Sequence, residues 1–269
     1  MTTAAGIGGA GRSELARILA GGRRFVTPAD ASVALEIDAD SAAKKLSRWA
    51  KDGWLRRVRR GLYIGVPVDA ADPWSWSEDA LVVAAEVWPC YFTGWTAAGE
   101  WSLTDQVFRT TVLKTTARVR AASVRLLDHD YLVTSVSEQH MAWGMKSQWR
   151  SECRLRFADP ARTVIDILDA PKLGGGMRHG AEILASYTDE HDALALIDYG
   201  DRVGNRAVFK RLGYTIEVLG ADLPDVVQAC RNRVSAGISA LDPDGPAGGR
   251  IATRWNLRVN VTIGAEEPA

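Results

Sequence analysis

The stretch of residues 37–66 restricts the fold of this chain more than any other part of the sequence. Near its start, Asp38 and Asp40 can each cap the free backbone N–H groups of a first helical turn. An Asp52-Gly53 pair can end that helix, because glycine adopts the left-handed conformation that closes a helix. Placed at about 100° per residue, the helix has one cationic and one apolar face. Two short β-type runs around an arginine-rich turn follow, so the stretch predicts a helix and a two-stranded hairpin.

Two further helices are predicted upstream of this stretch. Ser13 can cap the first, and Thr27 followed by Pro28 at the first helical position can start the second. The order helix, helix, helix, hairpin is that of a winged helix, whose third helix reads DNA. The predicted fold class is α+β, with a winged helix-turn-helix domain at 12–68 and a larger mixed α/β domain at 77–265.

The polar residues of the third helix and the hairpin are the candidate DNA-binding residues. The helix would enter the major groove, while the hairpin tip would meet the phosphate backbone or the minor groove. The hairpin arginines have no acid among them, and their mutual repulsion is unfavourable unless an anion compensates. The alternative interpretation is a solvated surface helix with one charged face. The candidates are Ser41, Lys44, Lys45, Arg48, Lys51, Arg56, Arg57, Arg59 and Arg60.

The charge of the chain is divided unevenly, although its formal net charge is zero. Residues 1–68 hold 12 Lys and Arg against 6 Asp and Glu, a net charge of +6. The remaining residues hold 21 against 27, a net charge of −6. Such asymmetry is typical of a nucleic-acid-binding module joined to a second domain.

The rest of the chain alternates between helical and strand-like segments. Residues 67–77 predict a linker, and residues 78–88 and 92–101 predict two helices. Alternating β-branched runs within residues 107–157 predict a small sheet. Further helices are expected after it, followed by a strand over residues 251–263.

Expectations also follow for two tryptophans after the predicted sheet strands begin and for one polar run in the last third of the chain. We expect Trp143 and Trp149 to pack against the predicted sheet. The run from Asp198 to Arg211 is dense in charge, and indicates either a salt-bridged surface or a contact face for a protein partner. No apolar stretch approaches the roughly 18 residues of a membrane span, and no secretory signal is visible, so a cytoplasmic location is expected.

No arrangement of residues predicts a catalytic or metal-binding site. The four histidines lack HExxH or HxH spacing, and the three cysteines lack a CxxC pair. There is no P-loop lysine and no GxSxG elbow. A nuclease would need clustered carboxylates with a lysine, and no convincing cluster stands out on the predicted strands. We therefore predict no catalytic residue, no metal ligand and no cofactor, and do not expect an enzyme.

Four segments together resemble the AbiEi-type antitoxins of bacterial type IV toxin–antitoxin pairs, particularly mycobacterial members with an N-terminal winged helix. They are Phe25–Pro28, Trp54–Tyr63, Asp159–Asp166 and Gly204–Tyr214. The resemblance implies an antitoxin that represses its own operon by binding double-stranded DNA, with more than one copy on the DNA left open. It also implies a C-terminal domain that neutralises a cognate nucleotidyltransferase toxin. Residues 74–101 match no motif of that family.

Two other functions remain open on the sequence. One is a metabolite-responsive winged-helix transcription factor whose C-terminal domain binds a small ligand. A ligand-dependent rise in melting temperature would favour it. The other is a nuclease, which metal-dependent cleavage of DNA would reveal.

Overall fold

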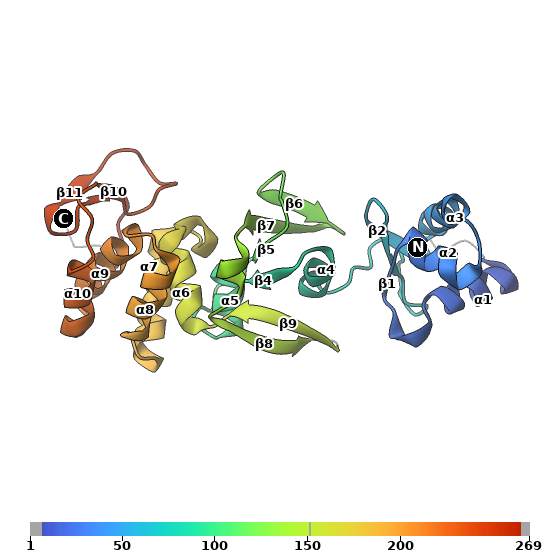
Figure 1. Ribbon diagram of the computed structural model, residues 1–269, viewed down its shortest axis with the longest axis horizontal. Coiled ribbons are helices and arrows are strands. Elements are labelled where there is room, and N and C mark those ends of the chain that lie inside the picture. Colours follow the sequence, from blue (N-terminus) through green and yellow to red (C-terminus); the bar gives the residue numbers. More distant parts are fainter. Residues whose placement is uncertain (1–6, 151, 265–269) are drawn as a thin grey trace. The chain divides into compact units, whose positions relative to one another are not determined.

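The protein is described by a computed structural model over residues 7–150 and 152–264, and it divides into two compact units (Figure 1). The N-terminal unit comprises residues 1–87 together with 125–130, and the C-terminal unit comprises residues 88–124 and 131–269. The predicted α+β class is confirmed: a winged helix comes first and a larger mixed α/β body follows. The predicted domain limits of 12–68 and 77–265 stay a prediction.

The N-terminal unit has the expected order of three helices and a hairpin. Strand β3 lies between β1 and β2 in an antiparallel three-stranded sheet. The first helix begins earlier than predicted, because Ser13 lies inside it and donates its hydroxyl to the Gly9 carbonyl instead of capping. The elements are α1 (Gly8–Ile18), η1 (Ala20–Gly22), β1 (Phe25–Val26), α2 (Pro28–Leu35), α3 (Ala39–Lys51), β2 (Leu55–Arg59), β3 (Leu62–Gly65) and α4 (Ala80–Val87).

The start of α2 shows how local sequence sets this unit. The Thr27 hydroxyl accepts a hydrogen bond from the Asp30 amide, and the Asp30 carboxylate accepts one from the Thr27 amide at 2.8 Å. This reciprocal pairing is a capping box, with Pro28 at the first helical position. The helices then bury Leu46 and Trp49 in one apolar core. The winged helix is thus held by caps and a small core.

The C-terminal unit contributes to a six-stranded sheet in the order β6-β7-β5-β4-β9-β8. Residues 92–101 were predicted to form one helix, but the segment starts as the end of a strand and turns helical after Thr93. The elements are β4 (Cys90–Phe92), α5 (Gly94–Glu100), β5 (Thr110–Thr115), β6 (Ser123–Leu126), β7 (His129–Ser135), η2 (Glu138–Met141), β8 (Met145–Arg150) and β9 (Cys153–Ala158).

Helices complete this unit, and α6 lies between α5, which packs on the sheet, and the helices that follow it (Figure 1). The strand predicted over residues 251–263 is in fact two short strands separated by a 3-10 turn, in a small sheet of order β10-β12-β11. The elements are α6 (Pro160–Asp169), η3 (Pro171–Gly174), α7 (Met177–Glu190), α8 (Ala195–Val203), α9 (Ala207–Leu219), α10 (Pro224–Arg231), β10 (Ser239–Ala240), β11 (Arg250–Ala252), η4 (Thr253–Trp255) and β12 (Leu257–Val259).

A buried ionic network joins α6 to the sheet. Asp166 is fully buried and pairs with Lys114 at 3.0 Å and with Arg162 at 2.9 Å. It also accepts hydrogen bonds from Tyr91 and Thr93. Burial alone would raise the pKa of Asp166, but the two cations and these hydrogen bonds outweigh it and lower that pKa. The polar residues of the Asp159–Asp166 segment are therefore part of the framework of the fold.

The polar run from Asp198 to Arg211 is divided between surface and interior. Asp201 lies at the surface and forms ion pairs with Arg206 and Arg233, as the salt-bridged interpretation predicted. Arg211 is buried and donates to backbone carbonyls on both sides of it, including Leu168 at 2.6 Å. Lys210 is buried as well and donates to the carbonyl of Gly237. The predicted contact face for a protein partner is therefore wrong for Lys210 and Arg211, because both side chains are buried.

Candidate nucleic-acid interface

Helix α3 carries a stripe of exposed polar residues opposite its buried face. The Asp38 carboxylate accepts a hydrogen bond from the Ser41 amide at 2.8 Å, which fixes the start of the helix. The apolar face of α3 is buried in the core of the N-terminal unit. The exposed residues follow one another at helical spacing and lie on one side: Ser41, Lys44, Arg48 and Lys51.

Lys45 is also on α3 but has a different environment. Its ammonium group is 2.6 Å from the carboxylate of Glu14 on α1, and its side chain is only 22% exposed. The same group lies 5.6 Å from the centre of the Trp49 ring. Lys45 therefore ties α3 to α1. Sequence reasoning missed Glu14, because a contact between residues 31 positions apart leaves no local signal.

The wing presents three arginines at its tip. Strand β2 buries Leu55 and Val58. The turn between β2 and β3 passes through Gly61, whose positive φ of 76° suits glycine. The side chains that point outward around it are those of Arg57, Arg59 and Arg60.

Arg56 is held inside the N-terminal unit. It donates one hydrogen bond to the Trp76 carbonyl and another to the Asp128 carboxylate at 2.8 Å. The hydrogen bond from Arg56 also holds the pKa of Asp128 below its ordinary value. Of the nine predicted residues, Arg56 and Lys45 are therefore already engaged, and the other seven are exposed.

Five of the six exposed cations of α3 and the wing lack acidic partners among the described residues. Among the ion pairs of the described residues, none involves the five cations Lys44, Arg48, Lys51, Arg57 and Arg60. Arg59 differs, because it has an acidic neighbour in Glu86. Partial burial and the charge of Asp30 raise the pKa of Glu86 above its ordinary value, and the charge of Arg59 offsets part of that rise. We name these six cations together with Ser41 the α3–wing surface. It offers side chains of the kind that bind phosphate.

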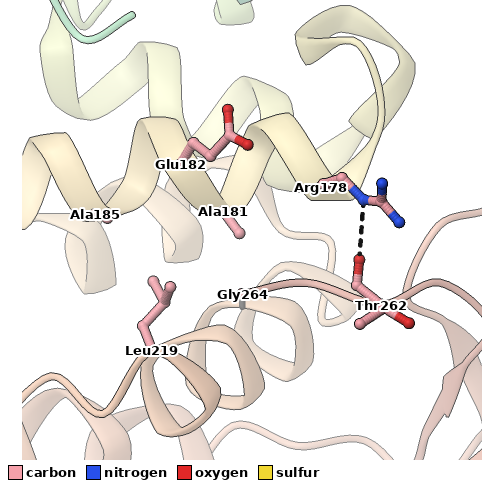
Figure 2. A pocket seen from close by; sticks show the side chains of 7 residues that line it. All are labelled: Arg178, Ala181, Glu182, Ala185, Leu219, Thr262 and Gly264. Atoms are coloured by element: carbon pink, nitrogen blue, oxygen red, sulfur yellow. Dashed lines mark hydrogen bonds between the residues drawn. The ribbon is translucent and has the colours of Figure 1, made fainter. Parts of the chain in front are cut away.

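The C-terminal unit contains a cavity of about 520 Å³. Figure 2 shows Ala181 on α7 and Leu219 at the end of α9 pointing toward one another across it. Arg178 donates a hydrogen bond to the Thr262 carbonyl at its rim. The lining residues are Arg178, Ala181, Glu182, Ala185, Leu219, Thr262 and Gly264. Its volume is within the range of small-molecule sites.

The described residues contain neither a metal-binding cluster nor a membrane-spanning helix. Over residues 7–150 and 152–264, no group of three or more His, Cys, Asp and Glu side chains could hold a metal ion. Within the same part of the chain, no helix is both long enough and apolar enough to cross a bilayer.

The order of three helices and a hairpin gives the N-terminal unit a winged-helix fold, which many DNA-binding transcriptional regulators share. Residues 13–64 match the family model described as "Transcriptional regulator, AbiEi antitoxin", so this segment is an AbiEi-type antitoxin regulator domain. This match confirms the resemblance noted in the sequence over residues 13–64, which contain its first two segments. No curated protein matches the chain.

A solved structure extends the likeness of fold beyond this segment. The crystal structure of the RV2827C protein from Mycobacterium tuberculosis superposes with a TM-score of 0.62, covering 91% of this chain and 90% of that chain. The two sequences are 15% identical over this match. The similarity therefore shows that the fold of this chain, in both units, resembles that of the RV2827C protein.

Proposed function

We propose that this protein represses its own operon by binding operator DNA with the α3–wing surface, and neutralises a cognate nucleotidyltransferase toxin with its C-terminal unit. The observation that carries the DNA-binding part is the set of exposed cations without acidic partners on α3 and the wing. Exposed like charges repel one another, and an external polyanion removes that cost. The proposed DNA-contact residues are the seven of the α3–wing surface, while Lys45 and Arg56 support the module.

The two parts of the surface would divide the work of recognition. Helix α3 has the position of a recognition helix, so Lys44 and Arg48 would face base edges in the major groove. The wing arginines would contact phosphates, with Arg59 and Arg60 reaching the minor groove. Phosphate contacts would set the register of the protein on the duplex, and base contacts would select the operator.

Binding to the DNA upstream of the gene, titrated against salt, tests the DNA-binding part. Neutralising roughly 5 phosphates predicts a slope of log affinity against log salt of about −4 to −5. Scrambled DNA of equal length is the control for specificity. A flat slope, or equal affinity for both duplexes, would contradict sequence-specific operator binding through this surface.

The antitoxin part is tested with the nucleotidyltransferase encoded beside the gene. Co-expression with this protein should restore growth that the toxin alone arrests. A variant with the α3–wing surface reversed to glutamate should still protect, because neutralisation is assigned to the other unit. Loss of protection in that folded variant would contradict the division of roles.

A second candidate function is a regulator that responds to a small metabolite. The cavity between α7, the end of α9 and residues 262–264 favours it, since the volume fits a small molecule and Arg178 and Glu182 supply charge at its lining. A screen for metabolites that raise the melting temperature tests it, with Ala181→Trp as a variant that fills the cavity. A stabilising metabolite whose effect is lost in that variant would support this second candidate.

A further inference from the structure

The hairpin of β8 and β9 has one face on which an exposed aromatic ring lies beside cations. The two strands pair antiparallel, with Ser147 opposite Arg156 and Trp149 opposite Arg154. Residues directly opposite each other in such a pair lie on the same face of the sheet. All four side chains are exposed. We name these four residues the β8–β9 face.

Trp149 is the residue least expected on this face. Trp143 and Trp149 were both predicted to pack against the sheet, and both predictions are wrong. Trp143 lies against the side chains of Arg162 and Tyr199, from α6 and α8. Trp149 is 71% exposed, and within residues 7–150 and 152–264 its ring makes no aromatic contact and no hydrogen bond. The ring of Trp149 is therefore open to stacking by a flat ligand.

Both charged residues of the β8–β9 face are basic. Arg154 forms no ion pair, and its side chain makes no hydrogen bond, with any described residue. Arg156 donates one hydrogen bond to the Met141 carbonyl at 2.6 Å, and a guanidinium has further N–H donors to offer. Glu152 lies in the turn between the strands and not on this face. The face therefore suits an anionic ligand.

The other cations of the hairpin belong to the opposite face and are already engaged. The Lys146 ammonium group lies 5.5 Å from the centre of the Trp101 ring, and Arg150 pairs with Glu100. Strand β8 is the last in the order β6-β7-β5-β4-β9-β8, so it is an edge strand. Charged side chains on an edge strand disfavour pairing with a strand of another chain. The free edge of β8 thus gives no reason to expect a protein strand.

The surroundings of Trp149 fit a nucleobase better than a protein surface. At protein interfaces, an anchoring tryptophan is enclosed by contacts that exclude water. On the β8–β9 face, its neighbours are one hydroxyl and two guanidinium groups, which hold water. A nucleic acid strand requires an aromatic ring on which a base stacks and cations for the adjoining phosphates. The β8–β9 face supplies both.

The same residues restrict the kind of nucleic acid. The bases of a duplex are already paired and stacked on one another, so only a single strand can place a base on an exposed ring. Ser147 lies two residues from Trp149 on β8, roughly 7 Å along the strand and on the same face. Its hydroxyl can donate and accept a hydrogen bond, as the 2′-hydroxyl of a ribose can. A hydroxyl beside the stacking ring favours RNA over DNA.

We infer that the β8–β9 face binds single-stranded RNA, with one base stacked on Trp149, the adjoining phosphates held by Arg154 and Arg156, and Ser147 beside the ribose. This inference is independent of operator binding and of toxin neutralisation, because it uses no residue of the α3–wing surface and requires no toxin. A second copy of this chain fits poorly, since Arg154 and Arg156 of the two copies would face each other.

The test measures the affinity of the full chain for a fluorescently labelled RNA of eight uridines by anisotropy. The wing can also attract phosphates, so all proteins compared carry Arg59→Glu and Arg60→Glu. In that background, Trp149→Ala should weaken RNA binding roughly 10-fold or more, because the stacking of one base is lost. Trp149→Phe keeps an aromatic ring and should lose much less affinity.

Arg154 is tested through the salt dependence in the same background. Arg154→Ala should reduce the steepness of log affinity against log salt by about 0.7, the value for one phosphate of a single strand. Arg120→Ala is the matched control, because Arg120 is an exposed cation of the same unit in the β5–β6 connection. It should leave the affinity and the slope unchanged. All variants should keep the circular dichroism spectrum of the background protein.

Several outcomes would overturn the inference. Equal RNA affinity with and without Trp149→Ala would remove the stacking site. Equal effects of Arg154→Ala and Arg120→Ala would mean that net charge, and not this face, attracts the RNA. Equal affinity for a DNA of eight deoxyuridines would contradict the choice of RNA. Self-association of the unchanged protein that Trp149→Ala abolishes would assign the face to a second copy.

Photochemical crosslinking locates the contact in the unchanged protein. A uridine RNA with 4-thiouridine at its centre is irradiated with the protein, and the crosslinked peptide is identified by mass spectrometry. Crosslinks are expected within residues 145–150. Crosslinks confined to residues 37–66 would place the RNA on α3 and the wing, and would overturn the inference.

Discussion

The two units use basic residues in opposite ways. In the N-terminal unit, the α3–wing surface exposes six cations in water, five of them without an acidic partner among the described residues. In the C-terminal unit, Lys114, Arg162 and Arg211 are buried and bonded to a carboxylate or to backbone carbonyls. A buried cation needs its partners for the fold to be stable, while an exposed one is available to an external anion. The same residue type therefore has a structural role in one unit and a binding role in the other.

The largest expected effect is on stability, and comes from removing the anion at the centre of the buried network. Asp166→Ala leaves Lys114 and Arg162 buried without their shared carboxylate, so we expect a loss of about 3–5 kcal/mol in unfolding free energy. Chemical denaturation measures it. Asp198→Ala is the matched control, because Asp198 is an exposed helical aspartate, and it should change stability by less than about 0.5 kcal/mol. If the two variants had equal free energies of unfolding, the buried cations of the C-terminal unit would not depend on their carboxylate partner, and the contrast with the exposed cations of the N-terminal unit would be lost.

The next effect is on DNA binding and is tested at the wing. The double variant Arg59→Glu and Arg60→Glu replaces two phosphate-binding cations with anions, and should weaken operator binding by roughly 100-fold or more. Its unfolding transition should stay unchanged. Arg118→Glu with Arg120→Glu is the control, because it makes the same change of charge at two exposed arginines of the C-terminal unit. If both double variants weakened binding equally, the effect would come from net charge and not from the wing.

A smaller effect separates the stability of the winged helix from its contacts with DNA. Thr27→Ala removes the hydroxyl of the capping box on α2 and should cost about 1 kcal/mol of unfolding free energy. Operator affinity and salt slope should not change where the protein is folded, because no cation of the α3–wing surface is altered. A changed salt slope in this variant would show that the cap also shapes the contact surface.

The same cap predicts a dependence on pH. The hydrogen bond from the Thr27 hydroxyl holds the pKa of Asp30 below its ordinary value. The stabilisation from Asp30 is therefore fully present above the unfolded pKa of about 3.9 and is lost as the pH falls through the lower pKa of the folded state. Thr27→Ala should accordingly show a weaker loss of stability on acidification than the unchanged protein.

The smallest effect compares two neighbouring lysines on α3. Lys44→Ala should weaken operator binding several-fold and reduce the steepness of the salt dependence by about 0.9, the value for one phosphate contact. Lys45→Ala should leave the salt slope unchanged, because Lys45 is already paired with Glu14. Equal slopes for the two variants would contradict the assignment of Lys45 to the ion pair with Glu14.

The N-terminal unit was largely predictable because its signals are local. Caps, a glycine turn and the 3.6-residue period of α3 act within a few residues of the chain, so the order of helices and hairpin follows from the sequence. The limits of this reasoning appear at Lys45 and Arg56. Their partners Glu14 and Asp128 lie 31 and 72 positions away, and neither leaves a mark in the local pattern. Seven of the nine predicted contact residues are exposed as expected.

By itself, then, the sequence determined the winged helix, its cationic helix face and wing, and the uneven division of charge along the chain. These depend on helical periodicity, turn chemistry and counts of charge. Only the tertiary structure decided which cations are exposed and which are buried, because burial depends on residues far apart in sequence. It likewise decided that Trp149 stands in water at the edge of a sheet, since strand order is set by long-range pairing.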